Sequence, residues 1–221
     1  MERPFRDRAA AGHALADRLT TYTDRPDVLV LALPRGGAPV AFEVARALDA
    51  PLDVYLVRKL GVPGHEELAM GAIATGGVRV LNDGVVRNLA ISEETIDRVA
   101  AAEGAELARR ERAYRDDRPA LAVADRTVIV VDDGLATGAT MRAAVAALRL
   151  QGPRRVVVAV PVAAPATCAE LGVEVGEIVC ALTPEPFYAV GLWYEDFAPT
   201  SDDEVRDLLA RAWRDDVGGV G

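Results

Sequence analysis

Two adjacent carboxylates, Asp132 and Asp133, stand where an apolar stretch ends and a glycine-containing loop leads into a predicted helix. Backbone N–H groups at a helix N-terminus, together with the positive end of the helix dipole, favour a bound phosphate. Carboxylates beside a phosphate would repel it unless they accept hydrogen bonds from sugar hydroxyls or hold Mg²⁺. The segment therefore predicts a site for ribose 5-phosphate, with Asp132 and Asp133 also as metal ligands. Its loop residues are Gly134, Leu135, Ala136, Thr137, Gly138, Ala139 and Thr140.

Basic and small residues follow two other apolar stretches. The small residues of Arg35-Gly36-Gly37 let backbone N–H groups approach a diphosphate, and Arg35 adds a cation. Arg58-Lys59 is a basic pair after the next apolar run. A solvated turn or a sheet edge would explain either motif by itself, so it is their shared position at strand ends that favours a diphosphate site.

Other phosphate-binding and catalytic motifs fit less well. A Walker A loop needs Lys after its second glycine, and here Ala139 follows Gly138. The segment lacks the glycine spacing of dinucleotide-binding turns, and no Ser-His-Asp or Cys-His pattern indicates acyl chemistry. An ordinary Asp-Gly turn before a capped helix remains the alternative to a phosphate site.

The hydrophobic pattern predicts the elements that position these motifs. Continuous apolar runs indicate strands buried on both faces, and their alternation with helical stretches predicts a three-layer α/β/α fold with a mainly parallel central sheet. Ligands of such sheets bind outside the carboxyl ends of the strands. The expected strands are 28–33, 53–57, 127–131, 155–160 and 177–182, and the expected helices are 5–23, 38–48, 92–117, 139–150, 165–171 and 201–213.

The remaining segments are expected to connect these elements. Residues 60–68 are loop-like, 69–82 are expected to form a hairpin around Gly76 and Gly77, and 183–200 are irregular. We expect a single domain over 1–221, with a core at about 25–185. A helical insertion at about 92–117 and a small C-terminal hood at about 183–221 complete the expected architecture.

The stretch VIVVDDGLATGAT at residues 128–140 resembles the motif with which type I phosphoribosyltransferases bind 5-phosphoribosyl 1-pyrophosphate (PRPP). It is most similar to the adenine-type members. The resemblance implies that Asp132 and Asp133 hold the ribose hydroxyls and that residues 135–140 wrap the 5-phosphate. Hypoxanthine-type members usually carry an acid at the position of Ala136, so the general base stays unassigned.

The same resemblance gives roles to the other motifs. Arg35-Gly36-Gly37 lies where the family places its pyrophosphate loop, and Arg58-Lys59 resembles the pair that contacts pyrophosphate in adenine- and orotate-type enzymes. Residues 61–67, GVPGHEE, resemble the mobile catalytic loop that closes over substrate. Glu67, next to the polar His65 and Glu66, is the carboxylate expected to meet the incoming base.

An aromatic cluster between residues 184 and 199 is the expected acceptor side, because aromatic residues make up only 5% of the chain. Trp193 and Tyr194 are expected to stack on a flat base. A hydrophobic plug over the sheet, or a contact within a homodimer, is the alternative. The helix at 92–117 lies outside what the resemblance specifies and fits a lid, an insertion or an interface.

Composition limits the partners. The 221 residues are 51% hydrophobic and 27% charged with a net charge of −9, which indicates a globular protein and argues against broad nucleic-acid binding. The chain has no apolar run near the roughly 18 residues of a membrane span. Its charged start lacks the apolar segment of a signal peptide. The expected location is the cytoplasm, where Cys168 and Cys180 would be reduced, packed thiols.

These observations predict a glycosyltransferase of nucleotide metabolism. It would use Mg²⁺ and move the 5-phosphoribosyl group of PRPP to a nitrogenous base, a purine among the candidates, with release of pyrophosphate. A PRPP-sensing regulator without turnover and a phosphosugar hydrolase on the same fold are the alternatives.

Overall fold

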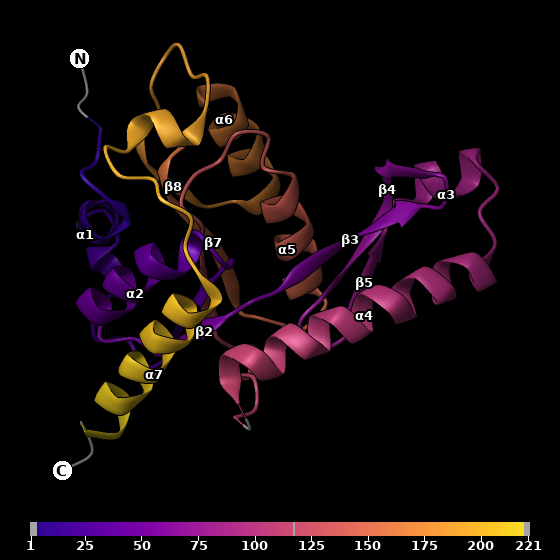
Figure 1. The fold of residues 1–221 in the computed structure, drawn as a ribbon. Helices are drawn as coiled ribbons and strands as arrows, with labels where there is room; N and C mark the ends of the chain where they lie inside the picture. The colour runs from indigo at the N-terminus through magenta and orange to yellow at the C-terminus, as the bar shows by residue number, and fades with distance from the viewer. Residues whose placement is uncertain (1–3, 117, 219–221) are drawn as a thin grey trace.

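The computed structural model, which describes residues 4–116 and 118–218, is built around a parallel sheet with the strand order β2-β1-β6-β7-β8 (Figure 1). Its strands are β1 (Val28–Ala32), β2 (Leu52–Val54), β6 (Thr127–Val131), β7 (Arg155–Val162) and β8 (Ile178–Leu182). Strands β1 and β6 pair along their whole lengths, and every residue in both is buried. Leu33 and Asp132 therefore emerge side by side at the carboxyl edge of the sheet.

Helices cover both faces of this sheet, which confirms the predicted three-layer α/β/α fold. Side chains alternate along each strand, so Val30 and Ile129 contribute to one hydrophobic core while Leu31 and Val130 contribute to the other. The first core is shared with α1 (Arg8–Ala16), α2 (Gly37–Leu48) and α7 (Asp202–Gly218). The second is shared with α5 (Ala139–Arg149) and α6 (Pro165–Val175). No helix in the described ranges is both long and apolar enough to cross a membrane.

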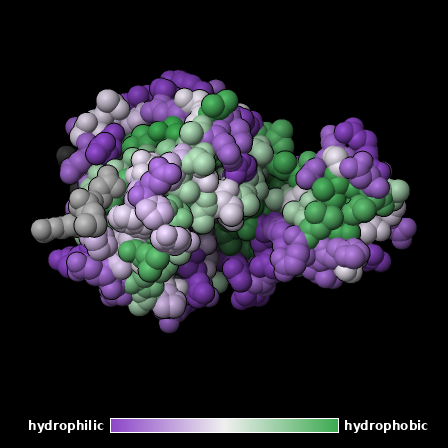
Figure 2. All heavy atoms as spheres, turned by 90° about the horizontal axis from the view of Figure 1, so that it is seen from above, coloured by the Kyte–Doolittle hydropathy of each residue, from purple (hydrophilic) through white to green (hydrophobic). Residues whose placement is uncertain are grey.

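Residues 57–115 form an arm that projects away from the rest of the chain, which we call the body (Figure 1). The arm contains an antiparallel sheet in the order β3-β4-β5. Its elements are β3 (Val57–Val62), β4 (His65–Ala74), β5 (Val78–Leu81), α3 (Asp83–Asn88) and α4 (Glu93–Arg115). Figure 2 shows a hollow between the arm and the body, and hydrophobic residues on the face of the arm turned to the viewer.

Two expectations about the arm are wrong. Residues 60–68 are not a loop but the paired ends of β3 and β4, joined by a tight turn at Pro63 and Gly64. Because β2 ends at Val54 and the chain then leaves the main sheet, Arg58-Lys59 lies inside β3 and not at a strand end of that sheet. This hairpin projects away from the body, so many of its side chains contact water and are polar. Its composition therefore resembles that of a loop.

Several other expectations can be compared with the structure. The hairpin at 69–82 is confirmed as β4 and β5. The long helix is confirmed as α4, with the side chain of Ser92 accepting the N–H of Thr95, and Asp117 lies outside the described residues. The first helix is shorter than 5–23, because α1 ends at Ala16 and a 3₁₀ turn follows at Thr20–Tyr22.

Cys168 on α6 and Cys180 on β8 form a disulfide, so the expectation of two reduced thiols is wrong. The pairing depends on α6 packing against β8, a contact between a helix and a strand that residue spacing does not reveal.

A buried ion pair joins the C-terminal end of α4 to the body. Arg115 is 4% exposed and Asp53 is 2% exposed. The guanidinium donates from Nε to Oδ1 of Asp53 at 2.7 Å and from Nη2 to the carbonyl of Val54 at 2.6 Å. Oδ2 of Asp53 also accepts the N–H of Leu121 at 3.0 Å. The position of the arm therefore depends on a pair of charges that water does not reach.

Candidate functional site

The acid pair lies directly after β6, and its second member is held by a residue from the N-terminal helix. Nε and Nη2 of Arg8 are each 2.9 Å from Oδ2 of Asp133, and both side chains are largely buried. Nη1 of Arg8 donates to the carbonyl of Ala198 at 2.7 Å. The guanidinium also lies over the ring of Phe197, 4.0 Å from its centroid. Asp133 is therefore fixed in place, while Asp132 accepts only the N–H of Asp133 among the described residues.

Burial decides the protonation of this pair. Burial raises the pKa of Asp132 to about 8, and repulsion from Asp133 adds to the shift. Burial also raises the pKa of Asp133, although the guanidinium of Arg8 opposes the change. A neighbouring cation or a hydroxyl donor would stabilise the charged form of Asp132. The chemistry of the pair thus suits a ligand that brings hydroxyl groups or a cation.

The loop after the acid pair exposes a row of backbone N–H groups. Gly138, with φ +70°, turns the chain into α5 as its N-cap residue. In the part of the chain that the structure describes, the N–H groups of residues 136–140 donate to no protein acceptor. Residues 136, 137, 139 and 140 are exposed. Consecutive free amides at a helix N-terminus are an anion-binding arrangement.

The carbonyl side of the same loop is held from behind. Oγ1 of Thr167 on α6 donates to the carbonyl of Ala136 at 2.6 Å, and Nη1 of Arg142 on α5 donates to the carbonyl of Thr137 at 2.6 Å. Arg142 is itself paired with Glu170 and Glu174. These contacts fix the loop with its carbonyls engaged, which leaves its amides available to a ligand.

Gly36 and Gly37 are needed because the loop after β1 crosses the acid pair at close range. A Cβ on Gly36 would lie 2.1 Å from Oδ2 of Asp133, and a Cβ on Gly37 would lie 2.7 Å from the carbonyl oxygen of Val131. In the described ranges the N–H groups of Arg35 and Gly36 have no acceptor, and the Arg35 side chain is exposed. A second set of free amides thus lies in the loop whose Gly36 passes close to Asp133.

The basic pair is divided between two places. Arg58 lines a small cavity of about 40 Å³ together with Leu33, Pro34 and Thr140, so it does reach both loops. It is paired with Glu103 of α4. Lys59 is 48% exposed, and its Nζ lies 3.6 Å from Oε2 of Glu67, which is fully exposed on β4. The structure therefore brings Arg58 to the loops and leaves Lys59 and Glu67 on the open side of the hairpin.

The aromatic segment supports the acid pair from the body side. The ring of Tyr194 is 6% exposed and packs against Phe5 and Phe197. Its hydroxyl donates to the backbone carbonyl of Asp133 at 2.6 Å. Trp193 is half-buried, and its carbonyl accepts the N–H of Phe5. In this arrangement the Tyr194 ring has little free face for a base.

Sequence reasoning missed the residues that act through tertiary contacts. These are Arg8, Arg142, Thr167 and Glu103. Arg142 had a detectable signal, because it lies one turn after the N-cap of α5. The other three carry no local signal, since each reaches the site from an element distant in sequence.

Mg²⁺ fits this site only when the ligand contributes oxygens. The described residues contain no group of three or more His, Cys, Asp or Glu side chains arranged to hold a metal ion. Asp132 offers a carboxylate, and Mg²⁺ is typically bound by one or two carboxylates together with substrate phosphates. The donor set therefore fits a cation that arrives with a diphosphate.

The chain is similar to known proteins both in sequence and in structure. A family model described as a phosphoribosyl transferase domain matches residues 7–171. The Mycobacterium tuberculosis H37Rv protein named "Putative phosphoribosyl transferase Rv0571c" is 49% identical over 211 residues, which cover 96% of this chain and 47% of that protein. The crystal structure of TT1426 from Thermus thermophilus has a TM-score of 0.83 and 44% identity, and the match covers 95% of this chain and 99% of that chain. The chain thus spans about half the length of the curated relative.

Proposed function

Because the chain belongs to the phosphoribosyl transferase domain family, we propose that it transfers the 5-phosphoribosyl group of PRPP to a small nitrogenous acceptor and releases pyrophosphate. The observation that carries the proposal is the row of free amides at residues 136–140 beside Asp132 and Asp133. A ribose 5-phosphate carries both groups that this site needs. Its phosphate oxygens accept hydrogen bonds from the amides, and its hydroxyl groups donate hydrogen bonds to the carboxylates.

Each part of the site takes one part of the substrate. The amides of residues 136–140 and the hydroxyls of Thr137 and Thr140 bind the 5-phosphate. Asp132 accepts hydrogen bonds from the ribose hydroxyls, and Arg8 keeps Asp133 oriented beside it. The amides of Arg35 and Gly36, with the side chains of Arg35 and Arg58, bind the diphosphate at the next strand end.

The reaction needs positioning and charge neutralisation and no protein nucleophile. A nitrogen lone pair of the acceptor forms a bond to the anomeric carbon as the bond from that carbon to the pyrophosphate oxygen breaks. The electron pair leaves with pyrophosphate, and the acceptor releases its proton. Mg²⁺ held by Asp132 and the oxygens of the substrate would neutralise charge on the departing diphosphate, and Arg58 would supplement it. We keep Glu67 as the candidate carboxylate for the acceptor, although it is fully exposed in this conformation of the hairpin.

Substitution of Asp132 tests the donor site. Asp132→Asn removes the carboxylate whose charged form the hydroxyl groups and the cation of the ligand would stabilise, and we expect PRPP to bind about 10- to 150-fold more weakly, which corresponds to about 1.5–3 kcal/mol. Calorimetric titration with PRPP and Mg²⁺ measures the loss, and chelation of Mg²⁺ should weaken binding to the wild type as well. The folded state should not suffer, because burial already disfavours the charge on Asp132.

Asp125→Asn provides the matched control, because this exposed aspartate precedes β6 and lies outside the site. An Asp132→Asn protein with PRPP affinity within twofold of the wild type would contradict the assignment. Pyrophosphate release in the presence of an acceptor supports transfer. Tight PRPP binding without turnover over a broad acceptor panel would favour a sensor, and phosphate release from PRPP alone would favour a hydrolase.

A further inference from the structure

Helix α4 brings a further arginine to the loops at the carboxyl edge of the main sheet. Arg110 lines the small cavity of about 40 Å³. Pro34 and Thr140 line the same cavity from the body, and Arg58 lines it from β3. A larger cavity of about 630 Å³ lies farther out in the arm, between the β3–β4 hairpin and α4, and its lining includes Arg58 and Arg98 but not Arg110. Arg110 therefore faces the inner space, next to the two loops.

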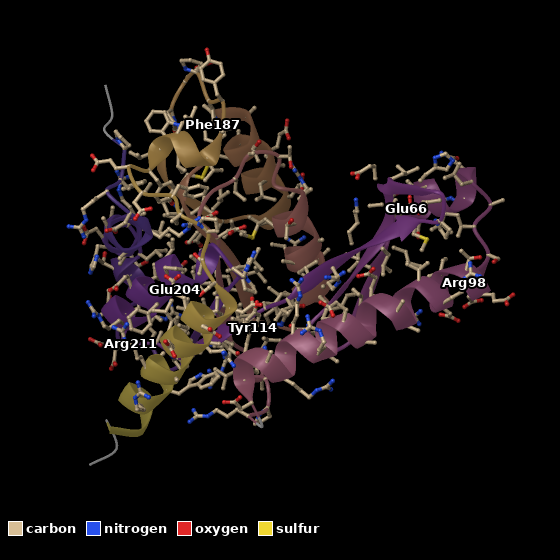
Figure 3. All side chains as sticks on the ribbon, in the orientation of Figure 1. Glu66, Arg98, Tyr114, Phe187, Glu204 and Arg211 are labelled. Atoms are coloured by element: carbon tan, nitrogen blue, oxygen red, sulfur yellow. A yellow bond between two sulfur atoms is a disulfide. The ribbon has the colours of Figure 1, made fainter. Side chains whose placement is uncertain are left out.

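The end of α4 that carries Arg110 is fixed to the body. Tyr114, one turn later, is 3% exposed, and its hydroxyl donates to Oδ1 of Asp202 on α7 at 2.6 Å. Arg115 follows and forms the buried pair with Asp53. Figure 3 shows Tyr114 near the end of α4 that meets the body. Arg110 is thus held near the loops by contacts that do not depend on the outer part of the hairpin.

Both arginines that the arm contributes to this cavity are paired with glutamates of α4. Glu103 is paired with Arg58, and Oε1 of Glu106 accepts from Nε of Arg110 at 3.0 Å. In the part of the chain that the structure describes, Nη1 and Nη2 of Arg110 donate to no protein acceptor. A guanidinium with free N–H groups can hold two oxygens of a phosphate through parallel hydrogen bonds.

Three arginines from different elements gather near this strand end. Burial and a hydrogen bond to Asp202 raise the pKa of Tyr114 to about 12, while the charges of Arg110 and Arg35 oppose the rise. Both guanidinium groups therefore lie close to the same ring, and Arg58 shares the small cavity with Arg110. Like charges gathered in one place repel each other unless anions lie between them. The glutamates of α4 offset two of these charges, and a diphosphate between the arginines would offset all three.

We propose that Arg110 is a binding residue for the diphosphate of PRPP, which makes α4 part of the donor site. The inference rests on the proposed function, because it adds a residue that contacts the substrate of that reaction. When the diphosphate binds beside Pro34, Arg110 exchanges its hydrogen bond to Glu106 for diphosphate oxygens, and Glu106 keeps its pairing with Arg109. The group transfer is unchanged: pyrophosphate leaves with the electron pair of the broken bond, and Arg110 stabilises the charge that develops on it.

Titration of the full chain with three ligands tests this role. PRPP, pyrophosphate and ribose 5-phosphate are each titrated by calorimetry in the presence of Mg²⁺. Arg110→Met should weaken the binding of PRPP and of pyrophosphate about tenfold, because a charged hydrogen-bond donor is lost. Ribose 5-phosphate carries no diphosphate, so its affinity should stay within about twofold of the wild type, which also shows that the variant is folded. Arg110→Lys keeps the charge and should recover part of the loss.

Arg109→Met is the matched control. Arg109 is the neighbouring residue of α4 and is paired with the same Glu106, but it is 63% exposed and does not line the small cavity. Its substitution removes the same charge from the same helix and should leave all three affinities unchanged. Equal losses in Arg109→Met and Arg110→Met would mean that the net charge of α4 sets the affinity, and they would overturn the inference.

Two further results would also overturn it. One is an unchanged affinity of Arg110→Met for pyrophosphate, and the other is an equal loss for ribose 5-phosphate and pyrophosphate. The wild type separates this inference from the proposed function. A wild-type protein that fails to bind PRPP refutes the proposed function, whereas one that binds PRPP just as tightly after the Arg110→Met substitution refutes only the role of Arg110.

Discussion

The carboxyl edge of the body and the open cavity of the arm differ in how much of their chemistry is already engaged. At the edge of the body, Arg8 holds Asp133, Tyr194 supports it from behind, and the glycines after β1 touch the acid pair. In the arm, the ion pairs are partly or fully exposed, and Arg98 has no partner among the described residues. The difference supports the proposed placement of the phosphoribosyl group at the edge of the body, where the polar groups are already held in position, and it leaves the arm as the more adaptable surface.

The two regions are joined by the buried pair of Asp53 and Arg115, so its loss is the strongest test of their connection. Arg115→Met leaves the carboxylate of Asp53 buried without its partner, and we expect the free energy of unfolding to fall by about 3–5 kcal/mol. Denaturant titration measures the change. Arg112→Met, at an exposed position of the same helix, should stay within about 0.5 kcal/mol. A comparable loss in both variants would show that α4 is sensitive to any such change and that the pair has no special role.

Crowding at the edge of the body gives the next largest effect. Gly37→Ala forces a methyl group against the carbonyl oxygen of Val131, and we expect a loss of about 1–3 kcal/mol from overpacking. Thermal or chemical unfolding measures it. Gly84→Ala is the matched change in the arm, where the nearest atom would be 3.4 Å away, and it should be neutral or slightly stabilising because Gly84 lies in α3. Equal losses at both glycines would contradict the contrast between a crowded edge and an open arm.

The tip of the arm should respond least. Leu68 is 42% exposed at the end of the hairpin, and Leu81 and Leu89 are exposed nearby in the same arm. We expect Leu68→Ser to change the free energy of unfolding by no more than about 0.5 kcal/mol, because the side chain loses little buried area. Leu60 lies in the same sheet but is 0% exposed, and Leu60→Ala should cost about 2–5 kcal/mol. A large loss from Leu68→Ser would mean that the tip is packed and not open.

Much of the fold followed from local pattern. The apolar runs located all five strands of the main sheet, because a strand covered on both faces must be apolar throughout. The hairpin of β3 and β4 was missed for the opposite reason. Its outer residues contact water, so a paired strand there has the same composition as a loop.

The sequence by itself determined the donor motif, because a strand, two acids, a glycine turn and a helix N-terminus are consecutive in the chain. It therefore pointed to Asp132, Asp133 and the amides after them without any knowledge of the rest of the molecule. Only the tertiary structure decided what surrounds them. Arg8 is paired with Asp133, Arg58 is paired with Glu103, and residues of β3 and α4 line one cavity. Each of these contacts joins residues that are far apart in the chain. Such contacts depend on the order of the strands in the sheet and on the point at which the arm leaves the body. Neither can be predicted from the spacing of neighbouring residues.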